Sequence, residues 1–290
     1  MTTETDQDIQ ASPEGEKLQK ILARMGVGSR REMERWITAG RVKVNDRKAT
    51  LGDRAGGSDL IQVDGQVLKR VDIRPRIVLL NKQEGIICTR SDPEGRPTCF
   101  DDLPRLNQGR WISIGRLDIN TSGLLLLSND GNFANRLMHP SANIDREYAV
   151  RVDGEISLDV LKALKNGVEL EDGFAKFADI RYFNGTGRNH WYHVVVLEGR
   201  NREVRRLFES QGIRISRLKR VRFGPVILPS ALLRGRRQEL SVDDVKALYR
   251  LLALPEPDLL QERKRVDSVL IAYPGLEKGA KRRRRSRQQK

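Results

Sequence analysis

The strongest constraint on the fold is an apolar run of only four residues, Leu124–Leu127, which directly follows the polar segment Gly115–Gly123. A run of this length suits a buried strand, whereas a helix that crosses a membrane needs roughly 20 apolar residues. No other apolar run in the sequence approaches that length. The sequence therefore predicts no membrane association and a core built around a buried central strand.

The charge of the chain points to a polyanionic partner. Its 290 residues carry a formal net charge of +15, with a pI near 10.1. Each Lys or Arg beside a phosphate releases condensed counterions, so a field of this sign favours nucleic acid. Residues 1–16 are acidic and lack the basic start and apolar centre of a secretory signal. We therefore expect a disordered acidic N-terminus and a cytoplasmic protein.

The cysteines and histidines do not predict a metal site. Cys88 and Cys99 are too few for a disulfide framework or a structural zinc site, so ordinary reduced thiols are expected. His190 and His193 are three residues apart in a strand-like run and would point to opposite faces. Gly185–Gly187 lacks the third glycine of a dinucleotide motif, and no P-loop sequence is present. We therefore expect no metal and no nucleotide cofactor.

Residues 17–69 predict a small compact unit that begins with a short amphipathic helix. Leu18, Ile21 and Leu22 have the spacing of one apolar helix face. Gly26 provides a natural end for this helix.

A second helix and short strands follow in the same unit. Ser29 and Glu32 have the capping-box spacing, in which each side chain binds a free backbone amide at the start of a helix. Gly40 is a natural stop for this helix. Beyond it, apolar and basic residues alternate around Val42, and a further hairpin is predicted over residues 61–67.

The polar face of this unit is rich in basic residues. They are Arg30, Arg31, Arg35, Lys43, Arg47 and Lys48. A charge run of this kind is often only a solvated helix face. The whole pattern of helices, glycines and hairpin nevertheless resembles the S4 domain, an RNA-binding module, over about fifty residues. The resemblance implies that the six basic residues bind RNA.

The rest of the chain divides into a linker, a larger domain and a tail. Residues 70–76 are charged, contain Pro75 and predict a flexible linker to the domain at 77–255. Residues 256–290 lose the apolar periodicity and include the basic cluster 281–285. They predict a disordered tail that either aids solubility or binds RNA.

The larger domain has the pattern of an α+β fold. Short strands are predicted at 77–80, 148–152 and 193–197. Helices are predicted after Ser157 and over residues 201–211. Strands mixed with a few helices indicate a mixed, mainly antiparallel sheet with flanking helices, and this sheet forms the floor of a groove.

Asp118 stands at the centre of the segment that precedes the apolar run. By itself, an aspartate within Gly115–Gly123 could simply close an Asx turn before a strand. The longer sequence, Gly-Arg-Leu-Asp and then Thr-Ser-Gly-Leu-Leu-Leu, resembles the signature of the RsuA-type and RluA-type pseudouridine synthases. These enzymes isomerise uridine in RNA, and the resemblance implies that Asp118 is the catalytic carboxylate.

A second motif extends the resemblance, which covers nearly everything from Ile77 to about Leu254. The segment Arg146–Val150 is similar to the tyrosine motif of the family, which implies that Tyr148 stacks on the target base. Without the family pattern, Tyr148 could be a core aromatic on an alternating strand.

A third segment, Glu198–Leu207, is similar to the basic motif of the family. This similarity implies that Arg205 is the partner of Asp118, although an arginine on a helix surface is the alternative. The following stretch, residues 216–224, is also similar to the family, which implies that Leu218 forms part of the pocket wall. The RNA contacts that the resemblance implies in this domain are those of Arg116, Arg200 and Arg202, of which Arg116 would enter the space that the uridine leaves.

The reaction needs the residue types that these motifs contain. It breaks the bond from N1 to the sugar, turns the base and joins C5 to the same sugar carbon, so it requires neither a redox cofactor nor a group donor. A carboxylate acts either as a nucleophile or as a base that removes a sugar proton. An adjacent guanidinium, here that of Arg205, keeps the carboxylate of Asp118 ionised and oriented. Because the base must leave its stack first, a platform such as Tyr148 is also needed.

The resemblance also implies a substrate, a hairpin of 23S ribosomal RNA near the peptidyl transferase centre, and a monomeric enzyme. Small-subunit or transfer RNA is an alternative, because RNA choice depends on shape and backbone contacts. A noncatalytic RNA-binding protein is a further alternative. Such a protein has no need for an acidic residue in a basic groove, where the carboxylate would repel phosphate.

Overall fold

The computed structural model describes residues 15–69, 73–259 and 267–276. Most of the predicted acidic N-terminus, the first three residues of the predicted linker and the basic cluster 281–285 lie outside the described residues. None of the helices that the structure describes is long and apolar enough to cross a membrane.

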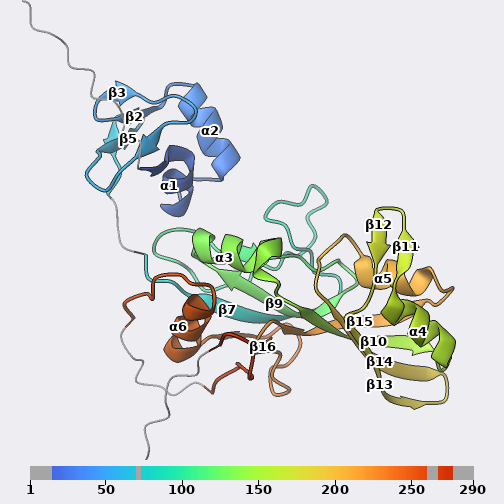
Figure 1. The fold of residues 1–290 in the computed structure, drawn as a ribbon. Helices are drawn as coiled ribbons and strands as arrows, with labels where there is room; N and C mark the ends of the chain where they lie inside the picture. Colours follow the sequence, from blue (N-terminus) through green and yellow to red (C-terminus); the bar gives the residue numbers. More distant parts are fainter. Residues whose placement is uncertain (1–14, 70–72, 260–266, 277–290) are drawn as a thin grey trace, which may run out of the picture. The chain divides into compact units, whose positions relative to one another are not determined.

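The chain divides into two compact units (Figure 1). The first consists of the residues up to Ile73 together with residues 105–110, and the second consists of the remainder. The segment 105–110 therefore groups with the small unit, although the sequence analysis included it in the larger domain.

The first unit packs two helices, α1 (Leu18–Arg24) and α2 (Arg30–Thr38), against short strands. An antiparallel sheet has the order β3-β2-β5-β6, and β1 pairs with β4. Buried apolar side chains from both helices and from the sheet form one core. The strands are β1 (Glu16–Lys17), β2 (Val42–Val44), β3 (Arg47–Lys48), β4 (Arg54–Ala55), β5 (Ile61–Val63) and β6 (Gln66–Val67).

The ends of these helices follow from the residues at their termini. Ser29 Oγ accepts a hydrogen bond from the Glu32 N–H at 3.1 Å, and the Glu32 carboxylate accepts one from the Ser29 N–H at 3.2 Å. This reciprocal pair is the predicted capping box. Gly26 and Gly40 follow the two helices with φ values of +86° and +71°, which lie in the left-handed region that glycine adopts most easily.

The second unit is built on a mixed, mainly antiparallel sheet, which confirms the predicted α+β fold. The strand order is β13-β14-β10-β15-β9-β7-β17, with β8 paired to β9 and β16 paired to β15. Among the described strands of this sheet, β15 and β9 are parallel, while the other named pairs are antiparallel. The bounds are β7 (Ile77–Lys82), β8 (Ile112–Ile114), β9 (Ser122–Ser128), β10 (Arg146–Asp153), β13 (Asp179–Thr186), β14 (Asn189–Val196), β15 (Ile215–Phe223), β16 (Val226–Ile227) and β17 (Arg237–Glu239).

The predicted apolar run forms the buried centre of this sheet. Strand β9 contains Leu124–Leu127, lies between β15 and β7, and is buried along its whole length. A separate small hairpin joins β11 (Val168–Leu170) to β12 (Gly173–Ala175).

Two apolar clusters stabilise the two halves of the large sheet. Helices α3 (Gly131–Met138) and α6 (Val242–Leu251) pack with β7 and β9, where Phe133 stacks on Tyr249 with ring centroids 5.0 Å apart. Helices α4 (Leu158–Asn166) and α5 (Glu203–Glu209) pack with β10, β14 and β15 (Figure 1). A 3-10 turn, η1 (Pro140–Ala142), follows α3.

The structure adds elements that the sequence analysis did not predict. Helices α3 and α6 were not expected, and residues 267–276 were assigned to the disordered tail. In this segment Val269 and Leu270 are instead buried, and Leu270 forms an antiparallel bridge with Val226. A short apolar run between polar neighbours has no repeat, so its periodicity cannot indicate burial.

One row of paired residues crosses the middle of the sheet, and we call it the central row. It consists of Val194, Tyr148, Arg220, Gly123 and Lys82, which are successive partners on β14, β10, β15, β9 and β7. A Cβ atom on Gly123 would lie 2.2 Å from the backbone oxygen of Arg220, and Gly123 has a φ of +101°. The close approach of β9 to β15 therefore requires glycine at this position.

We expect Gly123→Ala to lower the free energy of unfolding by about 1 to 3 kcal/mol more than Gly187→Ala does. Gly187 also has a positive φ, of +57°, but no atom lies within 4 Å of an added Cβ, so this control lacks the clash. Urea unfolding followed by circular dichroism would measure both variants. Equal losses of stability would contradict the packing argument.

Candidate active site

A cavity of about 600 Å³ lies in the second unit and includes Tyr148 and Arg220 of the central row in its lining. Every residue of this unit that the sequence analysis proposed for the site lines it. These residues are Arg116, Asp118, Tyr148, Arg200, Arg202, Arg205 and Leu218. The fold thus brings together the loop before β9, strands β10 and β15, and the start of α5.

Lys82 fixes the backbone of the loop that carries Asp118. The Lys82 side chain is 1 % exposed, and its ammonium donates hydrogen bonds to the carbonyl oxygens of Asp118 at 3.1 Å, Thr121 at 2.8 Å and Gln83 at 2.9 Å. Burial lowers the pKa of this ammonium. The Thr121 N–H also donates to the Asp118 carbonyl oxygen at 3.0 Å. These bonds hold the main chain and leave the Asp118 carboxylate out of the network.

Asp118 differs from the other carboxylates that line the cavity. Glu198 accepts a hydrogen bond from the Arg200 guanidinium at 2.6 Å. Glu203 is buried and accepts the Arg200 backbone N–H at 3.3 Å. The half-buried Asp118 side chain has no hydrogen-bond or ion-pair partner in the part of the chain that the structure describes. Its oxygens are therefore available to a ligand.

Arg205 reaches the same loop from α5. Its Nη2 donates to the Asn120 carbonyl oxygen at 2.9 Å, and its Nε is buried without a partner among the described residues. Burial and the charge of Arg202 lower the pKa of Arg205, while the charge of Asp118 opposes this change. The structure contains no direct hydrogen bond between the described side chains of Asp118 and Arg205, so their pairing stays a prediction.

Tyr148 and Leu218 provide an apolar side to the cavity. They lie on the neighbouring strands β10 and β15, where Leu218 is buried and Tyr148 is half-buried against the apolar cluster of that half of the sheet. A partly exposed aromatic ring beside an aliphatic side chain offers a flat surface on which a base can stack.

Arg146 and Arg220 also line the cavity, and the sequence analysis gave them no role. Arg220 is 2 % exposed, and its Nε donates to the Leu124 carbonyl oxygen at 2.7 Å. Both guanidiniums lie 5.2 Å from the ring centroid of Phe223. The position of Arg220 two residues after Leu218 on a strand, which puts both on one face, is the signal that could have identified it.

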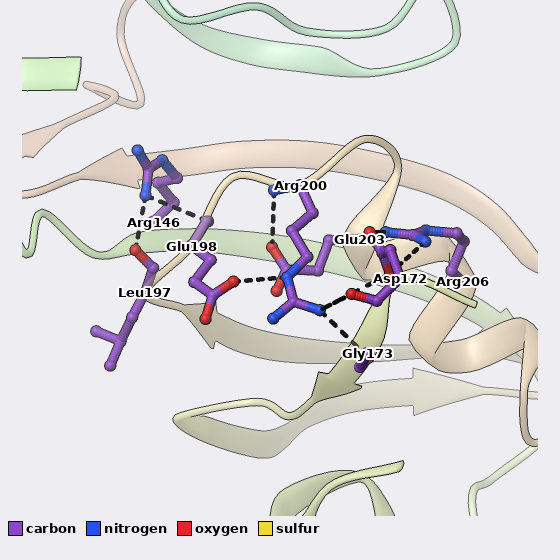
Figure 2. Close-up of polar contacts among 8 residues, drawn as sticks. All are labelled: Arg146, Asp172, Gly173, Leu197, Glu198, Arg200, Glu203 and Arg206. Atoms are coloured by element: carbon purple, nitrogen blue, oxygen red, sulfur yellow. Dashed lines mark hydrogen bonds and ion pairs between the residues drawn. The ribbon is translucent and has the colours of Figure 1, made fainter. Parts of the chain in front are cut away.

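Figure 2 shows how the segment between β14 and α5 is held in place. Arg146 Nη1 donates to the carbonyl oxygens of Leu197 at 2.9 Å and Glu198 at 3.2 Å. Arg200 Nη1 donates to the carbonyl oxygens of Asp172 at 3.3 Å and Gly173 at 3.2 Å. These bonds fix one wall of the cavity.

The arginines of this wall differ in how many of their donors are used. Arg200 and Arg206 both contact Asp172, and the pair between Arg206 and Asp172 is bidentate, at 2.7 and 2.8 Å (Figure 2). Arg202 is exposed, and its nearest ionic contact is with Glu209 at 3.6 Å. Arg202 is therefore freer to meet RNA than Arg200, whose predicted RNA contact would compete with intramolecular bonds.

The basic residues predicted to bind RNA in the first unit all lie at its surface. Those on α2 are Arg30, Arg31 and Arg35, and those on β2 and β3 are Lys43, Arg47 and Lys48. Of these, Arg47 forms an ion pair with Asp53 at 2.9 Å. Their RNA contacts remain predictions.

The two cysteines are free thiols that lie close together. The Cys99 N–H donates to the Ile87 carbonyl oxygen at 2.9 Å, and a hydrogen bond from the Cys99 thiol lowers the pKa of Cys88. No group of three or more His, Cys, Asp or Glu side chains suited to a metal ion occurs among the residues that the structure describes.

The cavity combines a free carboxylate, an aromatic platform and several arginines. A carboxylate on a fixed backbone can attack a sugar carbon or remove a proton from it. The arginines attract a polyanion, and the ring of Tyr148 can receive a base that has left its stack.

Family models match both units. The model described as RNA pseudouridylate synthase matches residues 76–210, and the S4 domain model matches residues 16–61.

Curated relatives and a solved structure give the same result. The chain is 55% identical over 282 residues to ribosomal large subunit pseudouridine synthase B of Pseudomonas aeruginosa, covering 96% of this chain and 69% of that protein. It is 53% identical over 251 residues to the protein of the same name from Haemophilus influenzae, covering 85% of this chain and 70% of that one. A crystal structure of a pseudouridylate synthase aligns with a TM-score of 0.56 at 25% identity, over 80% of this chain and 99% of that chain.

We expect Glu203→Gln to stabilise the protein at about pH 7 and to reduce the dependence of its stability on pH. Burial raises the pKa of Glu203 above its ordinary value of 4.5, so the folded state binds a proton more readily than the unfolded state. The parent protein therefore gains stability from this group as the pH falls through the raised pKa toward 4.5. A neutral glutamine removes that gain.

Urea unfolding at pH values from 4.5 to about 7 would compare the free energies of unfolding of the parent protein, Glu203→Gln and the control Glu209→Gln. Glu209 is exposed on the same helix, so its substitution should leave the pH dependence close to that of the parent. Identical pH dependence for the parent and Glu203→Gln would refute the argument.

Proposed function

The chain belongs to the RNA pseudouridine synthase family, and from this premise we propose that it converts a specific uridine of 23S ribosomal RNA to pseudouridine with Asp118 as the catalytic carboxylate. An enzyme of this family is an isomerase, because the product contains the same atoms as the substrate.

The proposal rests on the position of the Asp118 side chain in the cavity and on its lack of a partner among the described residues. This side chain lines a cavity with Tyr148 and Arg205, its backbone is fixed by Lys82, and its oxygens have no partner in the described part of the chain. A carboxylate in surroundings rich in arginine repels phosphate and weakens RNA binding. A protein that only binds RNA therefore gains nothing from it, whereas an enzyme can use it in the reaction. This argument favours an enzyme over a noncatalytic RNA-binding protein.

Each of the other site residues has a role in the proposed reaction. Tyr148 stacks on the flipped base, and Leu218 walls the pocket beside it. Arg205 orients the carboxylate of Asp118, and its hydrogen bond to the Asn120 carbonyl oxygen at 2.9 Å, in the loop that carries Asp118, supports this assignment. Arg116 is exposed at the cavity and enters the space that the uridine leaves. Arg200 and Arg202 contact the RNA backbone.

The carboxylate can act by two routes. In one, an Asp118 oxygen attacks C1′ as N1 departs, which forms an ester that C5 later displaces. In the other, Asp118 removes the proton from C2′, so that a double bond to C1′ forms as N1 departs. The ring then turns and C5 bonds to C1′, as the Asp118 oxygen leaves C1′ in the first route and as the proton on Asp118 returns to C2′ in the second. C5 finally loses its proton and N1 gains one. Neither route requires a cofactor.

The relatives support the choice of substrate, because their names assign them to the large ribosomal subunit. We propose a hairpin near the peptidyl transferase centre, modified by a monomeric enzyme in the cytoplasm. The S4-like domain at residues 17–69, with its exposed basic residues, would bind the RNA, and the catalytic domain at residues 77–255 would react with it.

Mapping of pseudouridine in ribosomal RNA from cells with and without this chain would test the function directly. Loss of pseudouridine at one large-subunit position is the expected result. A missing site in small-subunit or transfer RNA would replace the proposed substrate, and an unchanged map would refute the function.

We expect Asp118→Asn to abolish pseudouridine formation or reduce it by several orders of magnitude, because asparagine keeps the size but not the charge that either route requires. RNA binding should be at least as tight as in the parent, because one negative charge facing a polyanion has been removed. Single-turnover conversion and equilibrium binding of the same RNA would measure the two effects separately.

Asp102→Asn is the matched control for this prediction. Asp102 is exposed in the same unit and does not line the cavity, so its substitution should leave the rate unchanged. Normal product formation by a folded Asp118→Asn protein would remove the catalytic assignment.

Deletion of residues 1–69 should weaken RNA binding more than it slows conversion of bound RNA, because phosphate contacts mainly position a substrate while the cavity reacts with it. Single-turnover rates at saturating protein, compared with binding affinities, would test this division. A truncated chain that binds normally but reacts slowly would reverse the roles of the two units.

A further inference from the structure

We propose that Arg220 binds a carbonyl oxygen of the target uracil and stabilises the negative charge that the ring carries when it leaves the sugar. The inference rests on the proposed function and adds a residue to the same site.

Arg220 is a buried cation with unused hydrogen-bonding capacity. Its side chain is 2 % exposed, and it lines the cavity. Its Nε donates to the Leu124 carbonyl oxygen, but its Nη2 is buried and has no partner among the described residues. None of the ion pairs within the described ranges includes Arg220. Because a buried donor without an acceptor costs free energy, the burial of Nη2 is unfavourable until a ligand supplies an acceptor.

Arg146 lies in the same surroundings as Arg220, and its contacts provide a comparison. Both guanidiniums lie 5.2 Å from the centre of the Phe223 ring, whose face attracts a cation but offers no acceptor oxygen. Arg146 Nη1 also donates to three carbonyl oxygens, those of Ile144, Leu197 and Glu198. Arg146 therefore holds the cavity wall, whereas Arg220 retains a donor for a ligand.

The central row places Arg220 beside the base platform. Arg220 on β15 is the direct partner of Tyr148 on β10, and its other neighbour is Gly123, five residues after Asp118. Paired residues of adjacent antiparallel strands have Cα atoms about 4.5 to 5.5 Å apart. A base stacked on Tyr148 therefore lies next to the Arg220 guanidinium, on the side toward the Asp118 loop. The ring offers two acceptors, O2 and O4, to such a donor.

The chemistry of ring release explains why a cation belongs there. When the bond between N1 and C1′ breaks, its electron pair stays on N1, so the ring becomes an anion whose charge is shared with O2 and O4. C1′ gains either a bond to an Asp118 oxygen or a double bond to C2′, and the ring is the same anion in both routes. When C5 bonds to C1′, the Asp118 oxygen leaves C1′ in the first route, and in the second the proton on Asp118 returns to C2′. C5 then loses its proton and N1 gains one, so no atom is added or lost. Arg220 donates a hydrogen bond throughout and transfers no proton.

The first test compares Arg220→Gln with the matched control Arg217→Gln on a synthetic RNA hairpin that spans the mapped uridine. Arg217 is exposed on the same strand and does not line the cavity. Loss of one donor to a developing oxyanion typically slows a reaction roughly 100- to 1,000-fold, and we expect this effect on the single-turnover rate of Arg220→Gln. RNA affinity should change only a few-fold, and the control should react like the parent.

The second test replaces the target uridine by 2-thiouridine or 4-thiouridine, because sulfur accepts hydrogen bonds more weakly than oxygen. The parent enzyme should be slowed by sulfur at one of the two positions. Arg220→Gln should show no further slowing at that position, since the contact is already absent and the two changes are not additive. A purely structural role for Arg220 would leave the sulfur effect unchanged.

A folded Arg220→Gln protein with the parent rate would overturn the inference. If that variant does not fold, the response of the parent enzyme still decides, because an equal rate with oxygen or sulfur at both positions leaves no carbonyl contact to assign. A parent enzyme that converts no uridine in the unmodified hairpin would refute the proposed function instead, since that conversion is the reference for every comparison.

Discussion

The arrangement of the site depends on the burial of one ammonium group. A lysine side chain that is 1 % exposed must find acceptors, and Lys82 finds three backbone carbonyl oxygens, two of them in the loop of Asp118. Those carbonyls can converge only if the loop folds back over the end of β7, where Lys82 pairs with Gly123. Since the backbone is held in this way, the Asp118 carboxylate needs no structural partner and stays available for chemistry.

The arginines that line the cavity differ in whether their hydrogen-bond donors have partners within the protein. Arg146 donates to backbone carbonyl oxygens, and Arg200 donates to backbone carbonyl oxygens and to the Glu198 carboxylate, so both hold the wall. Arg205 and Arg220 each keep a buried nitrogen without a partner among the described residues. An unsatisfied buried donor costs free energy in the unbound protein, and this cost is recovered only when a ligand brings an acceptor. In the cavity, Arg205 and Arg220 therefore have donors that an acceptor from a ligand could use.

Local signals in the sequence predicted the parts of the structure that depend on neighbouring residues. The capping box of Ser29 and Glu32 and the buried strand at Leu124–Leu127 are of this kind, because short segments determine them. The segments that line the cavity were found from motifs. Contacts between distant residues left no such signal: the burial of residues 267–276 depends on Val226, and the importance of Arg220 depends on its partners across three strands. Periodicity records which face is apolar, not which strands are adjacent.

The position of the cavity follows from a weak junction within the sheet. Strands β15 and β9 are paired over only two residue pairs, Lys219 with Ser122 and Arg220 with Gly123, whereas β7 and β9 are paired over six residues. Each half of the sheet is stabilised by its own apolar cluster, so the junction contributes little to either core. Charged side chains can line this junction without disrupting a core. The same parallel pairing brings the start of β9, and with it Asp118, beside the middle of β15. Tyr148 on one half therefore lines the same cavity as Asp118 on the other.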